Sequence, residues 1–90
     1  MAEFEEVQDH DPPLEGRISM TNRFGRPGTY GLVVLDTSLN NLLYAVIGDG
    51  TKGRIELMNK TGKLEEGTKV FIPKTRRGGD GYEVLEVRPA

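Results

Sequence analysis

Cysteine is absent from this chain of 90 residues, and so is any long apolar run. Without cysteine, neither a disulfide framework nor a thiolate metal site can form, and a reducing compartment is favoured. A membrane helix needs roughly 20 predominantly apolar residues, and the N-terminus is acidic where a signal peptide is basic. We therefore expect one soluble, cytoplasmic domain that makes no contact with membranes.

Histidine is almost as scarce, which bears on catalysis. The single histidine, His10, sits in the acidic N-terminal segment. One such histidine and no cysteine cannot supply a nucleophile, a base and an orienting group together. Glu65 and Glu66 fall in a predicted turn. Glu83 and Glu86 fall on opposite faces of a predicted strand. We expect a protein that is not an enzyme and that uses no cofactor, no metal ion and no small-molecule substrate.

Charge is divided unevenly along the chain. Residues 1–15 contain six acids and no Lys or Arg, so the other eight acids and all twelve bases belong to residues 16–90. The net charge of −2 therefore combines an acidic start with a mildly basic remainder. Two consecutive prolines, Pro12 and Pro13, interrupt regular structure. We interpret residues 1–14 as a disordered acidic tail with a Pro-Pro linker, which either adds only solubility or occupies the basic surface as a competitor.

From Gly16 onward, glycine and asparagine separate short runs rich in Val, Ile, Leu and Tyr, as in all-β domains. The predicted strands cover residues 16–24, 29–36, 42–47, 68–75 and 82–87. Between the third and fourth strands, residues 48–53 are interpreted as a loop and residues 54–58 as a short strand or a bend. This pattern predicts a small five-stranded Greek-key barrel of the oligonucleotide-binding type over residues 15–90, with an SH3-like barrel as the alternative.

Four short motifs carry a resemblance to a known family. They are EGRISMTN at residues 15–22, YGLV at residues 30–33, LYAVI at residues 43–47 and LEEGTKV at residues 64–70. In this order they resemble the first three strands of the cold-shock domain and the turn into its fourth strand. The resemblance implies a small oligonucleotide-binding barrel whose partner is RNA or single-stranded DNA.

The aromatic platform of that family is depleted in this chain. In cold-shock domains, aromatic side chains of the first three strands form a surface on which bases stack. Tyr30 and Tyr44 remain here, while the other matching positions are not aromatic: Met20, Thr21, Leu32, Val46 and Ile47. Base stacking on an aromatic ring is worth about 1 to 3 kcal/mol per base, so we expect weaker binding. The alternative function is a protein-interaction module that uses the aliphatic replacements Met20, Leu32, Val46 and Ile47.

Three aromatic residues and eight basic residues, Lys or Arg, are the candidates for nucleic-acid binding. Tyr30 and Tyr44 fall in neighbouring predicted strands, from which we expect both to project on one face for stacking; half-buried packing is the alternative. Phe24 lies between Arg23 and Arg26, a combination that can hold a base and a backbone together, or it plugs the end of the barrel. Basic residues in the first strand or in connecting loops are predicted to line a cationic groove, with ordinary solvated surface charge as the alternative: Arg17, Arg23, Arg26, Lys52, Arg54, Lys74, Arg76 and Arg77.

The glycine-rich sequence GDGTKG at residues 48–53 differs from a phosphate-binding loop. It lacks the four-residue spacing and the Gly-Lys-Ser/Thr ending of that motif, and no helix is expected to follow it. Asp36 and Asp49 are not set among alternating oxygen ligands, so a calcium loop is not expected either.

Overall fold

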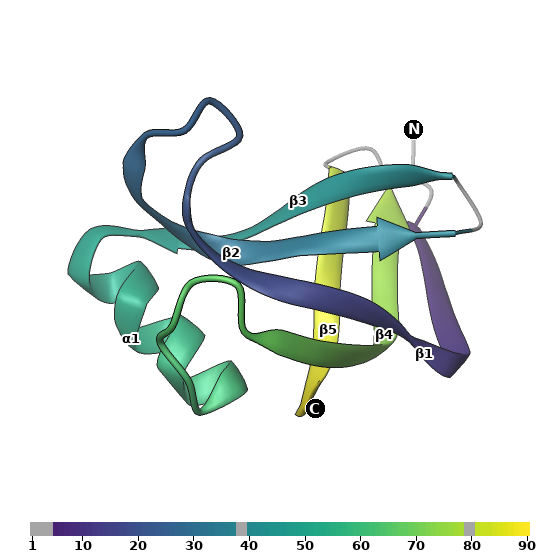
Figure 1. Cartoon of the computed structure of the whole chain (residues 1–90). Helices are drawn as coiled ribbons and strands as arrows, with labels where there is room; N and C mark the ends of the chain where they lie inside the picture. Colours follow the sequence, from purple (N-terminus) through teal and green to yellow (C-terminus); the bar gives the residue numbers. More distant parts are fainter. Residues whose placement is uncertain (1–4, 38–39, 79–80) are drawn as a thin grey trace.

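The computed structural model describes residues 5–37, 40–78 and 81–90, which form five strands and one helix (Figure 1). In chain order these elements are β1 (Glu5–Thr21), β2 (Pro27–Asp36), β3 (Asn41–Asp49), α1 (Gly50–Thr61), β4 (Lys69–Gly78) and β5 (Gly81–Pro89). The strands form one antiparallel sheet in the order β3-β2-β1-β4-β5. Each predicted strand overlaps an observed one.

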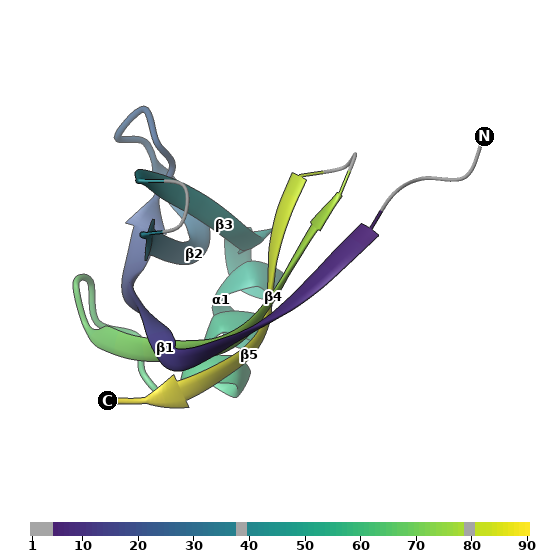
Figure 2. The ribbon, with the colours of Figure 1, turned by 90° about the vertical axis from the view of Figure 1, so that its right-hand side faces the viewer.

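The sheet has Greek-key topology and curls into a half-barrel. β1, β2 and β3 are successive antiparallel neighbours, and β4 returns to the other side of β1, which is the Greek-key arrangement. The curl is visible in Figure 2, where β2 and β3 lie on one side and β4 and β5 on the other, and β1 joins the two halves. The predicted fold class, a small five-stranded Greek-key barrel, is confirmed.

The core lies between the inner face of this curled sheet and α1. Side chains alternate between the two faces of a strand, so Leu32 and Val34 of β2 are buried whereas Leu35 is exposed. Every element contributes to one apolar cluster, formed by Leu14, Ile18, Leu32, Val34, Ala45, Leu57, Val70, Ile72 and Val84. The side chains on the opposite, outer face of β1, β2 and β3 therefore lie outside this core.

Helix α1 differs from the expectation for residues 48–58. The interpretation of residues 48–53 as a loop and of residues 54–58 as a strand or bend is wrong, because α1 begins at Gly50 and continues to Thr61. Gly62 ends the helix with φ of 72°, and its N–H donates to the carbonyl of Met58 at 2.8 Å. The buried face contains a single large apolar side chain, Leu57, so the sequence has no helical hydrophobic period.

Two glycines explain the composition of this junction. A Cβ atom on Gly53 of α1 would lie 2.2 Å from the carbonyl carbon of Gly48 in β3. Any larger side chain would force the helix away from the strand. Contrary to expectation, a helix does begin within this glycine-rich sequence. Gly48 and Gly53 allow the helix to pack closely against β3.

The N-terminal segment is not a disordered tail over residues 5–13. Residues 5–9 pair with β4 in register, from Glu5 opposite Gly78 to Asp9 opposite Lys74. Nε2 of His10 lies 2.8 Å from Oγ1 of Thr75 in a hydrogen bond. Main-chain pairing with β4 and the attraction between its bases and the acids of this segment hold the segment in place. It was not predicted as a strand because it contains few apolar residues. Residues 1–4 of the predicted tail lie outside the described residues.

The two prolines bend β1 instead of ending it. The register of β1 against β4 shifts between Asp9 and Leu14, the interval that contains Pro12 and Pro13. Proline has no N–H for the ladder, so pairing is interrupted there and the strand changes direction. The expected linker is therefore a bend within a single strand.

Candidate nucleic-acid interface

The outer face of β1, β2 and β3 carries three cross-strand rows of side chains. Residues paired across neighbouring strands project from the same face of a sheet. The register sets Ser19 beside Gly31 and Val46, Arg17 beside Val33 and Tyr44, and Glu15 beside Leu35 and Leu42. This face is thus apolar along β3 and polar along β1.

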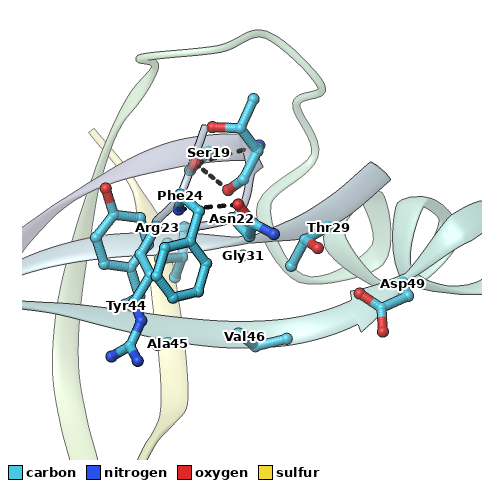
Figure 3. Close-up of a pocket in the computed structure, with 12 residues that line it drawn as sticks. Ser19, Asn22, Arg23, Phe24, Thr29, Gly31, Tyr44, Ala45, Val46 and Asp49 are labelled. Atoms are coloured by element: carbon cyan, nitrogen blue, oxygen red, sulfur yellow. Dashed lines mark hydrogen bonds between the residues drawn. The ribbon is translucent and has the colours of Figure 1, made fainter. Parts of the chain in front are cut away.

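A cavity of about 420 Å³ opens on this face, between the β1–β2 loop and β3. Phe24 and Tyr44 both line it, together with Arg23, Val46 and Asp49. Figure 3 shows Phe24, Tyr44 and the Arg23 guanidinium toward one end and Asp49 toward the other. Gly31 lies in its floor, and a Cβ atom there would lie 2.4 Å from the Ala45 carbonyl oxygen.

The β1–β2 loop presents Phe24 through a local hydrogen-bond network. Oδ1 of Asn22 accepts hydrogen bonds from the N–H groups of Phe24 at 2.9 Å and Arg26 at 3.0 Å. An asparagine that bonds to the backbone ahead of it stabilises such turns. The Phe24 side chain is 75% exposed, and Cζ of Arg23 lies 4.9 Å from its ring centroid. Phe24 therefore stands outside the core and does not plug the barrel end.

The two tyrosines lie on opposite faces. Tyr44 is 44% exposed and lines the cavity, whereas Tyr30 is half-buried and packs against the core. The expectation that both project from one face is wrong, because Tyr30 shares the inner face of β2 with Leu32. Among the three aromatic candidates, Phe24 and Tyr44 are brought together and Tyr30 is not.

The eight candidate Lys and Arg residues fall into three separate groups. The first accompanies the outer face: Arg17 lies in the row of Tyr44, and Arg23 and Arg26 belong to the β1–β2 loop. Arg17 also donates from Nη1 to the carbonyl of Gly67 at 3.2 Å, which anchors its side chain near the sheet. The second group, Lys52 and Arg54, lies exposed on α1.

The third group, Lys74, Arg76 and Arg77, lies in β4, where acids accompany it. Nζ of Lys74 is 3.6 Å from Oδ1 of Asp9 and 3.7 Å from Oε2 of Glu86. Nη1 of Arg76 donates to Oε1 of Glu83 at 3.2 Å. Arg76 and Arg77 belong to a strand and not to a connecting loop as expected.

The aliphatic replacements do not form a common surface. Leu32 is fully buried, and Met20 and Ile47 pack against the core. Only Val46 of this set is exposed, at 63%. Of the aliphatic residues predicted for a protein interface, three therefore contribute to the core. The exposed aliphatic side chains that share the outer face with Val46 are Leu35 and Leu42, two rows away.

Several polar residues of the cavity were not predicted from the sequence. Asn22, Thr29 and Asp49 contribute polar groups to its wall. Asn22 had a local signal, since it precedes Phe24 and Arg26 at the spacing of an asparagine-stabilised turn. Thr29 and Asp49 had no local signal in the sequence, because only the pairing of β2 with β3 brings them together.

On the outer face, Glu15 of β1 and Lys69 of β4 form a close ion pair. Nζ of Lys69 lies 2.7 Å from Oε1 of Glu15, and this hydrogen bond and the lysine charge lower the pKa of the Glu15 carboxyl from its ordinary value of 4.5. A carboxyl with a lowered folded-state pKa stabilises the fold above its unfolded pKa, and this contribution is lost as the pH falls through the folded pKa. Because both side chains are exposed to solvent, the effect is small.

We therefore expect Glu15→Gln to lower the thermal midpoint at neutral pH. The difference from the wild-type protein should shrink as the pH is lowered from 4.5 through the folded pKa of Glu15. Thermal unfolding of the two proteins, followed by circular dichroism at neutral pH and at a series of acidic pH values, measures this convergence. A difference that stays constant with pH would contradict the role of the pair.

No family model, curated protein or solved structure matches this chain. No helix in the described ranges is long and apolar enough to cross a bilayer. Within the same ranges, no group of three His, Cys, Asp or Glu side chains is placed to hold a metal ion. The geometry of the outer face is accordingly the basis for a functional proposal.

Proposed function

We propose that this protein binds RNA or single-stranded DNA, without catalysis, on the outer face of β1, β2 and β3. The observation that carries the proposal is the shared cavity of Phe24 and Tyr44, beside which Arg23 lies 4.9 Å from the Phe24 ring. Small oligonucleotide-binding barrels use the face of strands 2 and 3 and the loop between strands 1 and 2. Phe24 and Tyr44 come from these two places.

The chemistry of this face suits an unpaired nucleotide. A base stacks on an exposed aromatic ring irrespective of its identity, and a neighbouring cation contacts the phosphate. Phe24 and Tyr44 are the two exposed rings of the cavity. Arg17, Arg23 and Arg26 supply positive charge around them. Exposed aromatic rings in water cost hydrophobic free energy, which a stacked base would recover.

Binding is expected to weaken with salt at a modest slope. Phosphate contacts by Arg17, Arg23 and Arg26 predict a log-log slope of about −2, from about 0.7 per contact on a single strand. Fluorescence anisotropy titrations with single-stranded homopolymers over a series of salt concentrations measure the slope. Arg26→Gln should reduce its magnitude by about 0.7, because one contact is lost.

Lys74→Gln is the matched control for this measurement. Lys74 is also an exposed base, but Asp9 and Glu86 accompany it on β4. We expect the slope of this variant to equal that of the wild-type protein. An affinity that does not change with salt would exclude the cationic contacts.

A protein partner is the second candidate function, favoured by the exposed aliphatic side chains of Leu35, Leu42 and Val46. Exposed apolar groups that gather on one face are typical of protein interaction sites. The same titrations separate the two functions. Absence of binding to every single-stranded homopolymer at low salt would favour the protein partner.

A further inference from the structure

The cavity of the outer face has a polar end opposite its aromatic end. Asn22, Thr29 and Asp49 belong to the wall of this cavity, and Thr29 and Asp49 lie directly opposite one another in the register of β2 and β3. Figure 3 shows Asp49 and Thr29 on the side away from the Arg23 guanidinium. Stacking and phosphate contacts make no use of these three side chains.

Asp49 offers an acceptor to whatever occupies the cavity. It stands at the N-cap position of α1, where a carboxylate usually accepts a hydrogen bond from the first turn of the helix. Its side chain makes no such bond and belongs to the cavity wall instead. Both carboxylate oxygens are therefore available as hydrogen-bond acceptors at the cavity wall.

Asn22 offers a donor of fixed orientation. Its Oδ1 accepts the N–H groups of both Phe24 and Arg26, which determines which side of the amide is oxygen. The Nδ2 group is then left to donate. The wall of the cavity thus combines a donor from Asn22, beside Phe24, with two acceptors from Asp49 at the far end.

The two ends of the cavity also differ in charge. Arg23 beside the Phe24 ring attracts a phosphate, whereas the carboxylate of Asp49 repels one. This difference favours a bound nucleotide whose phosphate lies toward the arginines and whose base edge lies toward Asp49.

We infer that this cavity selects guanine among the bases of a single strand, through Asp49 and Asn22. The inference rests on the proposed function and adds the identity of the base. The Watson–Crick edge of guanine presents two adjacent donors, N1–H and the N2 amino group, which match a carboxylate, followed by the O6 acceptor, which matches Nδ2 of Asn22. Uracil presents one N–H between two carbonyl oxygens, and these oxygens are repelled by a carboxylate. Adenine and cytosine each present one amino group beside a ring nitrogen acceptor.

The test is a titration of the full chain with short oligouridines that differ at one central base. A central guanine is expected to raise affinity about tenfold over uracil, within the range of a bidentate base contact. Hypoxanthine in the same place lacks the N2 amino group, so it should lose most of this gain. The comparison needs no variant and does not depend on whether a variant folds.

Asp49→Asn tests the residue, because an amide of the same size presents one acceptor in place of two. The preference for guanine over uracil should fall about tenfold in this variant. Glu56→Gln is the control, since Glu56 is a second exposed carboxylate, lies on α1 and is outside this cavity. It should leave the preference unchanged.

The outcomes separate the inference from the function on which it rests. Equal affinities for guanine, hypoxanthine and uracil, with binding that weakens in salt, would overturn guanine selection and retain the binding of single strands. A guanine preference that Asp49→Asn leaves intact would overturn the role of Asp49. Absence of binding to every oligonucleotide would overturn both proposals.

Discussion

Replacing Tyr44 with alanine is expected to weaken binding to single-stranded nucleic acid by about 1 to 3 kcal/mol, the value of one base stacked on an aromatic ring. The Tyr44 side chain is exposed at the cavity and lies outside the core. The fold should therefore be retained while the stacking surface is lost. Phe24→Ala should have an effect of similar size. Anisotropy titrations at one fixed salt concentration, with thermal unfolding of each variant, measure both quantities.

Leu42→Ala is the matched control for Tyr44→Ala. Leu42 projects from the same face of the same strand, two residues from Tyr44, but it does not line the cavity. We expect its affinity for single strands to equal that of the wild-type protein. If both Tyr44→Ala and Phe24→Ala bind as tightly as wild type, stacking on these rings is refuted. If Leu42→Ala instead abolishes capture of a protein partner, the aliphatic row is the interface.

Replacing Leu57 with alanine is expected to lower the free energy of unfolding by about 2 to 5 kcal/mol, as for other fully buried leucines. Leu57 is 0% exposed and is the only large apolar side chain on the buried face of α1. Its truncation would leave a cavity between the helix and the sheet, because the other buried residues of α1 are Gly53 and Thr61. Urea unfolding followed by circular dichroism measures the change.

Ile55→Ala is the control on the same helix. Ile55 is 56% exposed, so its truncation should change stability by no more than about 0.5 kcal/mol. Similar losses in the two variants would mean that α1 does not pack on the core through Leu57.

The strands were predictable because their signal is local. Glycine and asparagine mark the ends of runs rich in β-branched residues, and β1 to β5 overlap all five predicted strands. Helix α1 was missed because its buried face consists of Gly53, Leu57 and Thr61. Two of these three residues are not apolar in character, so no period of 3.6 residues is visible.

The candidate site was predictable in part. Phe24 and its flanking arginines were found because an aromatic residue among cations is visible in the sequence. The face of Tyr30 was not, since β2 is nearly uniformly apolar from Tyr30 to Leu35, and an uninterrupted apolar run does not show which residues point inward. The place of residues 5–9 was not predictable either, because their partner is β4, near the other end of the chain.

Because Glu5 pairs with Gly78, the first part of β1 can join the sheet only late in synthesis of the protein. The first part of β1 cannot complete its ladder until residue 78 has left the ribosome. Contacts between residues so distant in sequence form late and slowly, so this segment spends the interval as an unpaired strand. Unpaired strands recruit other chains unless charge prevents it. Like charges repel, so the carboxylates of this segment oppose its pairing with the same segment of another chain. In the folded sheet one of them is accompanied by a base, since Oδ1 of Asp9 lies 3.6 Å from Nζ of Lys74 in β4.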